Sequence, residues 1–155
     1  MVIRTAETAD CDELILLIEE LYFYHENFNN NFKIDDNHFI LTKNVLLDKI
    51  ENANSEILIC VFNTKIVGMM ILSCTINQRF IVKNRGYIHE TIVNEEYRGY
   101  GVGSKLINQA NLWFENLNVE VIELQVSCLN TEAVSFWNKH GFQIITYHLL
   151  KSLKK

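Results

Sequence analysis

The sequence predicts an α+β fold: a single domain over residues 1–155, with a mixed, mostly antiparallel twisted sheet and helices on both faces. Three observations lead to this prediction. Apolar residues recur at helical spacing near both ends of the chain, β-rich runs follow one another in its middle, and helical and strand-like segments alternate after residue 102. The length of 155 residues suits one domain, and neither a linker nor an internal repeat divides it.

The first third of the chain predicts one strand and two helices. Residues 2–6 predict a short strand, and Asp10 with Glu13 predicts a capping box. An amphipathic helix follows, with apolar residues at i, i+3, i+4 and i+7: Leu14, Leu17, Ile18 and Leu21. The period is lost over residues 22–38, where we expect a loop or a broken helix, and a second helix is expected over 41–51.

The middle third predicts an antiparallel meander. Ile57–Phe62 and Ile66–Thr75 read as strands joined by a tight turn at residues 63–65. Phe80–Val82 predicts a further short strand, and residues 84–86 predict a turn into a strand over Tyr87–Val93.

The last third returns to helical spacing. The helix after Gly103 carries one apolar stripe: Leu106, Ala110, Trp113, Phe114 and Leu117. Val119–Val126 predicts a strand, and Thr131–His140 a short helix that ends at a left-handed Gly141, with Phe142 packing back. Gln143–Leu149 predicts a last strand before a basic tail over residues 151–155.

Composition excludes several classes of partner. The formal net charge of −5 disfavours a nucleic-acid binder, and neither a signal peptide nor a membrane-spanning apolar run is expected. The four cysteines are scattered without a CxxC pair, which favours reduced thiols in the cytoplasm. The five histidines never occur at i, i+4 or beside a cysteine, so no metal is expected. A homodimer is left open.

Glycine use marks one backbone site. The chain has six glycines and no proline, and Gly99, Gly101 and Gly103 fall between a strand that ends at Val93 and a helix that begins near Val102. Glycines at a helix start let backbone N–H groups face an anion, most readily a phosphate. A plain tight turn is the alternative, although one glycine normally suffices for a turn. Gly103-Ser104-Lys105 excludes both a dinucleotide GxGxxG motif and a Walker loop.

At these residues the chain resembles the GCN5-related N-acetyltransferase (GNAT) family. The family signature [Q/R]-x-x-G-x-[G/A] is met by Arg98, Gly101 and Gly103. A second family element follows at the expected distance: Asn130, Ala133, Phe136 and then Lys139–Phe142. The first residues, Val2–Arg4 and Ala9–Cys11, also look like the usual start of these enzymes, so the resemblance covers nearly the whole chain.

The resemblance implies binding of acetyl-CoA as cosubstrate and direct acetyl transfer to an amine. The strand end at Ile92 and Val93 would pair with the pantetheine arm, and the Val93 N–H would polarise the thioester carbonyl. Asn130 would reach the arm from the other side. The pyrophosphate would lie on the backbone amides of one stretch: Arg98, Gly99, Tyr100, Gly101, Val102, Gly103 and Ser104.

Acetyl transfer needs a base, because a primary amine has a pKa of roughly 10 and attacks only after losing a proton. Glu90 is the candidate, with His89 beside it as a substrate contact. Strand alternation predicts that the two side chains point to opposite faces. A solvated strand charge is the alternative for Glu90, and a packed or surface histidine is the favoured interpretation of His89. The run Tyr87–Glu90 looks like that of the polyamine acetyltransferases, with His89 in place of one acid.

Two further features concern the substrate walls. Many relatives have a tyrosine at the position of Trp137 that protonates the CoA thiolate, which an indole cannot do. We place Trp137 beside the cosubstrate, with a core aromatic as an equal alternative. The aromatic and polar run Tyr22, Tyr24, His25, Glu26 and Phe28 falls where relatives build one wall of the acceptor site. We place Tyr24 and Glu26 in that wall, whereas packing of the first helix is the favoured interpretation of Tyr22 and Phe23.

Three functions therefore compete. The first is an N-acetyltransferase acting on a small cationic amine, of polyamine or aminoglycoside type. The second is a CoA-binding module that is weakly active or inactive, which the tryptophan at position 137 motivates. The third is a peptide or protein N-terminal acetyltransferase, which needs an open groove beside residues 22–38.

Overall fold

The computed structural model describes residues 1–28, 33–35, 37–151 and 153. These residues form two compact units, Met1–Gln125 and Val126–Lys155, each of which is described by itself. The elements of the first unit are β1 (Val2–Thr5), η1 (Thr8–Asp10), α1 (Cys11–Glu26), α2 (His38–Glu51), β2 (Ser55–Phe62), β3 (Lys65–Ile76), β4 (Asn84–Val93), η3 (Glu95–Tyr97), α3 (Val102–Asn116) and β5 (Val121–Leu124). The second unit contains α4 (Thr131–Lys139).

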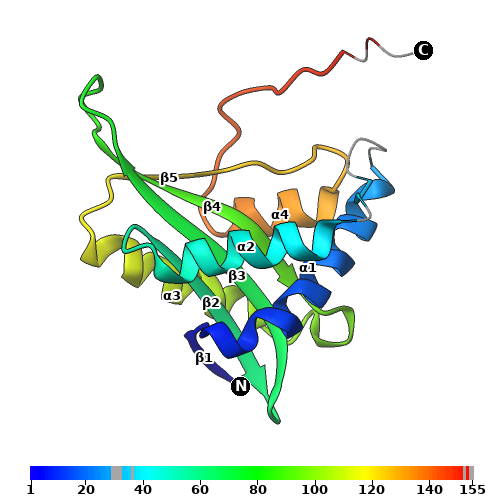
Figure 1. Ribbon diagram of the computed structural model, residues 1–155. Helices are drawn as coiled ribbons and strands as arrows, with labels where there is room; N and C mark the ends of the chain where they lie inside the picture. Colours follow the sequence, from blue (N-terminus) through cyan, green and yellow to red (C-terminus); the bar gives the residue numbers. More distant parts are fainter. Residues whose placement is uncertain (29–32, 36, 152, 154–155) are drawn as a thin grey trace. The chain divides into compact units, whose positions relative to one another are not determined.

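The first unit is built on a five-stranded sheet in the order β1-β2-β3-β4-β5 (Figure 1). Its first four strands pair antiparallel, and β5 pairs parallel to β4. The tight turn between β2 and β3 is confirmed, with left-handed φ values of 48° at Asn63 and 68° at Thr64. This mixed sheet with its helices confirms the predicted α+β class. That the whole chain is one domain stays a prediction.

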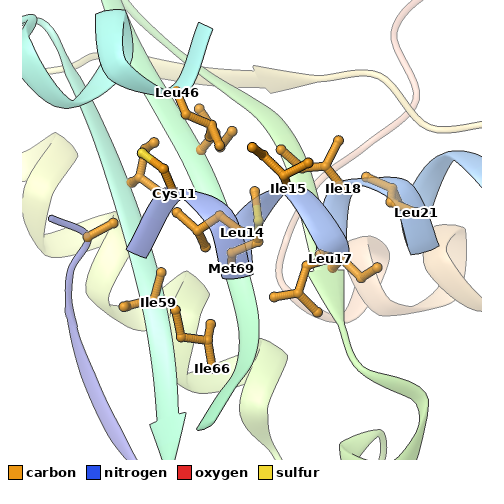
Figure 2. Packing of buried hydrophobic residues seen from close by; sticks show 14 residues of the cluster. Cys11, Leu14, Ile15, Leu17, Ile18, Leu21, Leu46, Ile59, Ile66 and Met69 are labelled. Atoms are coloured by element: carbon orange, nitrogen blue, oxygen red, sulfur yellow. The ribbon is translucent and has the colours of Figure 1, made fainter. Parts of the chain in front are cut away.

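Helices cover both faces of the sheet. Alternate residues of a strand point to opposite faces, and β3 shows the consequence. Met69 belongs to the buried cluster beneath α1 and α2, whereas a Cβ atom on Gly68 would lie 2.9 Å from Val102 of α3. Figure 2 shows the cluster on the first face, where side chains of α1 such as Leu14 meet Met69 of the sheet. Truncating a fully buried leucine of this kind to alanine typically costs about 2–5 kcal/mol.

The first helix begins differently from the prediction. Its capping box joins Glu7 and Asp10 across η1, and the Glu7 N–H donates to Asp10 Oδ2 at 2.7 Å. Glu13 instead accepts a hydrogen bond of 2.7 Å from the Ile66 N–H at the start of β3. The capping box predicted from Asp10 and Glu13 is therefore wrong, because Glu13 fastens the helix to the sheet.

Parts of the predicted loop over residues 22–38 are helical. The helix α1 continues to Glu26 and α2 begins at His38, so the pattern was lost only because polar and aromatic residues occupy the end of α1. Residues 29–32 and 36 of this predicted loop lie outside the described residues.

Several strand predictions need correction. Residues 80–82 belong to the turn between β3 and β4, and residues 84–86 lie inside β4. Gly86 serves packing and does not turn the chain, because an added Cβ would lie 2.5 Å from Phe114 Cε1 of α3. The strand predicted over 119–126 is shorter and spans Val121–Leu124.

The second unit confirms one prediction and contradicts another. Gly141 ends α4 with a left-handed φ of 87°, and the Phe142 N–H donates to the Trp137 carbonyl at 3.1 Å. The strand predicted over 143–149 is wrong, since residues 142–151 have no regular structure. A strand forms only where a second strand takes up its backbone hydrogen bonds, and the described part of this unit contains none. Residues 152, 154 and 155 of the predicted basic tail lie outside the described residues.

Candidate functional site

The second half of β4 has an open edge. The strand β5 pairs with β4 only from Arg85 to Ile88, so among the described residues of this unit β3 is the sole ladder partner of His89–Val93. The Asn94 N–H donates to the Val67 carbonyl of β3 at 3.0 Å. Because hydrogen-bonded and non-hydrogen-bonded pairs alternate in an antiparallel ladder, the N–H and C=O of Val93 face away from β3. The sequence-predicted Val93 therefore presents its backbone to the open edge, next to the partly buried Thr91.

The second half of β4 also carries a buried hydroxyl group that has no hydrogen-bond partner among the described residues. This group is Oγ1 of Thr91. A buried polar atom in that condition costs free energy unless a ligand or water meets it. The open half of β4 therefore suits an extended polar ligand.

The glycine loop follows directly. Gly99 and Gly101 have left-handed φ values of 79° and 80°, while a Cβ at either would meet no atom within 4 Å. Backbone conformation, and not space, therefore requires these two glycines. Gly103 is the second residue of α3, which starts at Val102 as the sequence predicts.

The start of α3 leaves its first amides outside the helical ladder. The ladder begins where the Lys105 N–H donates to the Gly101 carbonyl at 3.0 Å. The amides of Val102 and Gly103 come before that bond, at the positive end of the helix dipole. Tyr100, between the two left-handed glycines, is 70% exposed. This geometry suits an anion such as a phosphate.

Arg98 fastens the loop to its neighbours. Its Nε donates to the Val93 carbonyl at 3.0 Å, and its guanidinium carbon lies 5.4 Å from the ring centre of Tyr24 on α1. Arg98 thus joins the strand end, the loop and the first helix. Tyr24, predicted for the acceptor wall, contacts this loop residue and Phe28, whose ring centre is 5.2 Å away.

A β-bulge places His89 and Glu90. Met70 pairs with Thr91 and Leu72 with Ile88, so Ile71 alone lies opposite both residues. An extra residue of this kind interrupts strand alternation. Opposite faces were predicted for the two side chains, and that prediction is wrong because it assumed an unbroken strand.

The contacts of the His89 and Glu90 side chains show which face of the sheet they occupy. His89 Nε2 lies 2.7 Å from the Ser73 hydroxyl, and Glu90 Oε1 accepts a hydrogen bond of 3.3 Å from the Tyr22 hydroxyl of α1. Ser73 shares its face of β3 with Met69, and Tyr22 packs against the cluster that contains Met69. Both side chains therefore lie on the face that α1 and α2 cover.

The pKa values of the side chains around Glu90 are shifted by burial. Desolvation, followed by the charge of Glu90, raises the pKa of Tyr22 to about 12, so its hydroxyl stays protonated and donates. Desolvation lowers the pKa of His25 and that of His89, and the charge of Lys49 lowers the pKa of His89 further. The charge of Glu90 offsets only part of these shifts. Both imidazoles are then mainly neutral at pH 7.

Sequence reasoning favoured a packing role for Tyr22 and missed Glu20 altogether. Tyr22 follows Ile18 by four residues and so looked like part of the packed face. A partly buried tyrosine nevertheless needs a partner for its hydroxyl, which was the available signal. Glu20 gave no signal, and its Oε2 accepts a hydrogen bond of 3.3 Å from Asn94 Nδ2 just after β4. Glu26, predicted for the acceptor wall, is the last residue of α1, and Phe23, predicted to pack, is 61% exposed.

Two predicted residues belong to the second unit. Asn130 caps α4, where its Oδ1 accepts a hydrogen bond of 3.1 Å from the Ala133 N–H. The Trp137 ring centre lies 5.0 Å from that of Phe136 and 5.2 Å from that of Phe142. These contacts give Trp137 a packing role within its unit, and the roles of both residues toward a cosubstrate stay predictions.

Two further observations concern metal binding and membrane insertion. No cluster of three or more histidine, cysteine or acidic side chains is arranged to hold a metal ion among them. Within the same residues, no helix is both long and apolar enough to cross a membrane.

Solved structures with this fold include acetyltransferases. The tetramutant of the BH1408 protein from Bacillus halodurans superposes with a TM-score of 0.88 at 20% identity, covering 99% of this chain and 100% of that one. An aminoglycoside acetyltransferase from an uncultured soil metagenomic sample, in complex with sisomicin, gives a TM-score of 0.73 at 21% identity, covering 99% of this chain and 96% of that one. At these identities the likeness shows the fold alone.

Sequence relatives carry the comparison further. An uncharacterized N-acetyltransferase of Archaeoglobus fulgidus is 28% identical over 137 residues, which are 88% of this chain and 89% of that protein. An uncharacterized N-acetyltransferase of Methanocaldococcus jannaschii is 31% identical over 85 residues, or 55% of this chain, and the match spans only 38% of that longer protein. A model of the acetyltransferase (GNAT) family matches residues 15–142, from α1 through the end of α4. The chain therefore belongs to the acetyltransferase (GNAT) family.

Proposed function

We propose that the protein is an acetyl-CoA-dependent N-acetyltransferase that transfers the acetyl group directly to a primary amine of a small cationic acceptor. The observation that carries the proposal is the continuity of three features along one stretch of chain. The bulge with Glu90, the open backbone edge at Val93 and the glycine loop before α3 follow one another within residues 89–104.

The proposed cosubstrate position follows from these features. The pantetheine arm would extend along the open half of β4, and the pyrophosphate would lie on the amides at the start of α3. The Val93 N–H is then the donor for the thioester carbonyl, whose oxygen gains negative charge during attack. One such donor typically lowers a barrier by a few kcal/mol, about 3–4 in the best-studied case. Acetyl-CoA fits the chemistry of this stretch, since the Val93 N–H faces the open strand edge and the start of α3 suits a phosphate.

Glu90 is the proposed base. An aliphatic amine with a pKa of roughly 10 must lose a proton before it attacks, and a carboxylate can accept that proton directly or through water. The Tyr22 hydroxyl contacts Oε1 of Glu90, so Oε2 is the oxygen we assign to the amine.

The acceptor class rests on charge and on one neighbour. The Glu90 carboxylate accepts a hydrogen bond from the Tyr22 hydroxyl and lies close enough to His25 and His89 to act on their pKa values, and its negative charge suits an ammonium group of the acceptor. The sisomicin complex of the soil acetyltransferase supports an aminoglycoside-type acceptor. We also propose a cytoplasmic location, which suits the four free cysteines.

A thiol-release assay tests the proposal. Purified protein with acetyl-CoA should release CoA in the presence of at least one amine from a panel of aminoglycosides, polyamines, amino acids and short peptides. Glu90→Gln should lower kcat about 100-fold or more. Glu96→Gln, on the exposed η3 turn, is the matched control and should retain full activity. Equal activity of Glu90→Gln and the control at neutral pH would remove Glu90 as the base.

A CoA-binding module without catalysis is the second candidate, favoured by Trp137 at the position of the family's tyrosine. Its packing against Phe136 and Phe142 offers no proton donor for the leaving thiolate. A CoA thiol has a pKa of about 8.5, so its thiolate is an adequate leaving group even without a general acid. Calorimetric binding of acetyl-CoA without turnover over the whole amine panel would establish this candidate instead.

A further inference from the structure

The side chain of Glu90 meets α1 through Tyr22, a residue for which the sequence favoured a packing role in the first helix. Tyr22 lies in the second half of α1, and its hydroxyl is 3.3 Å from Glu90 Oε1. The two residues are 68 positions apart in the chain, so the contact exists only because the fold brings α1 against β4. The bulge at residues 89 and 90 is what turns Glu90 toward α1.

The tyrosine is a rigid donor. Its ring packs against the buried cluster beneath α1 and α2, which includes Leu21 and Ile92. A tyrosine has only two side-chain torsions, whereas a glutamate has three and loses more rotamer freedom when it is fixed. The packed Tyr22 ring can therefore fix the position of the Glu90 carboxylate, whereas the more flexible Glu90 side chain is poorly suited to fix the ring.

The direction of the hydrogen bond is fixed by protonation. The pKa of Tyr22 is raised to about 12, by desolvation first and then by the charge of Glu90. At every pH where an amine acetyltransferase works, the hydroxyl keeps its proton and donates to the carboxylate. That bond occupies one carboxylate oxygen and leaves the other to accept a proton.

We propose that Tyr22 is a positioning residue: its hydroxyl holds the Glu90 carboxylate in the orientation that accepts a proton from the acceptor amine. The proposal rests on the proposed function, because it assumes that Glu90 is the base. Tyr22 does not touch the acetyl group and acts only through Glu90.

Kinetics of four proteins test the proposal: wild type, Tyr22→Phe, Glu90→Gln and the double variant, with sisomicin and spermidine as acceptor probes. Tyr22→Phe should lower kcat about 10-fold, the value of one hydrogen bond to a charged group, and should leave the KM for acetyl-CoA unchanged. In the Glu90→Gln background the same substitution should have no further effect, since the two residues act as a unit. Tyr97→Phe is the control, because it removes a hydroxyl from a ring that packs on Phe62 outside this contact.

The outcomes separate the two levels of the argument. An equal loss from Tyr22→Phe in both backgrounds would make its role merely structural and overturn the proposal. Full activity of Glu90→Gln would refute the proposed function first, whatever Tyr22 does.

A readout without any acceptor covers the case in which neither probe is acetylated. With tyrosine ring carbons labelled, the Tyr22 phenol should titrate at about 12 in wild type. It should titrate at lower pH in Glu90→Gln and be unmoved in Glu96→Gln. Failure of Glu90→Gln to lower that titration would show that the contact does not form, and the proposal would fall.

Discussion

Gly86→Ala tests how β4 is seated on α3. The structure has no room for a Cβ at this position, which would lie 2.5 Å from Cε1 and 2.7 Å from Cδ1 of Phe114. Phe114 is 1% exposed and cannot swing into solvent. Forcing an extra methyl into such a core costs about 1–3 kcal/mol. For a chain of this size each kcal/mol lowers the melting temperature by about 2–4 °C, so a fall of about 2–12 °C is expected.

Thermal and urea unfolding of four proteins separate this clash from other effects: wild type, Gly86→Ala, Phe114→Leu and the double variant. Shortening Phe114 makes room for the methyl, so the double variant should lose clearly less stability than the sum of the single losses. Gly99→Ala is the control, because its Cβ meets nothing within 4 Å and its cost comes from the left-handed φ of 79°. That cost should not change in the Phe114→Leu background. A stability of Gly86→Ala within about 0.5 kcal/mol of wild type, or strict additivity with Phe114→Leu, would refute the packing argument.

Three further predictions follow from the site. Gly101→Ala should cost about 1–2 kcal/mol in unfolding free energy, because alanine resists a φ of 80°, and should weaken acetyl-CoA binding measured by calorimetry. Arg98→Lys keeps the charge but loses the planar fork that donates to Val93 and lies over Tyr24, so the Kd for acetyl-CoA should rise about 3–10-fold, and an unchanged Kd would contradict the anchoring role. A raised folded-state pKa binds the proton more tightly, so the stability from the Tyr22 phenol is complete below pH 10 and is lost as the pH rises toward about 12. Urea unfolding across that window should show a steeper decline for wild type than for Tyr22→Phe.

The glycine loop shows what the sequence alone could predict. Three glycines before an amphipathic stripe predict a helix start that exposes backbone amides, and the structure has Gly101 left-handed at the residue before α3. The hairpin at Asn63 and Thr64 and the cap of α4 at Gly141 are equally local, and both are confirmed. Each of these features depends only on residues a few positions apart in the sequence, so a local sequence pattern can predict it.

The surroundings of Glu90 could not be predicted from local sequence patterns. The bulge at Glu90 depends on which residue of β3 lies opposite, and the partner of its carboxylate comes from α1. Gly86 looked like a turn residue, because the side chain that leaves no room for a Cβ there, Phe114, lies on a helix distant in the sequence. Residues 143–149 have the alternation of a strand, but the alternation supplies no partner strand.

The central claim is that acetyl-CoA lies along the open half of β4 and ends at the start of α3. An amide chemical-shift titration of the labelled protein with CoA tests it most directly, since every backbone N–H reports separately. We predict that the largest shifts occur at Val93, Gly99, Gly101 and Val102. If the largest shifts instead occur around the cavity lined by Thr5 and Trp113, while Val93 and the glycine loop do not shift, the account is contradicted.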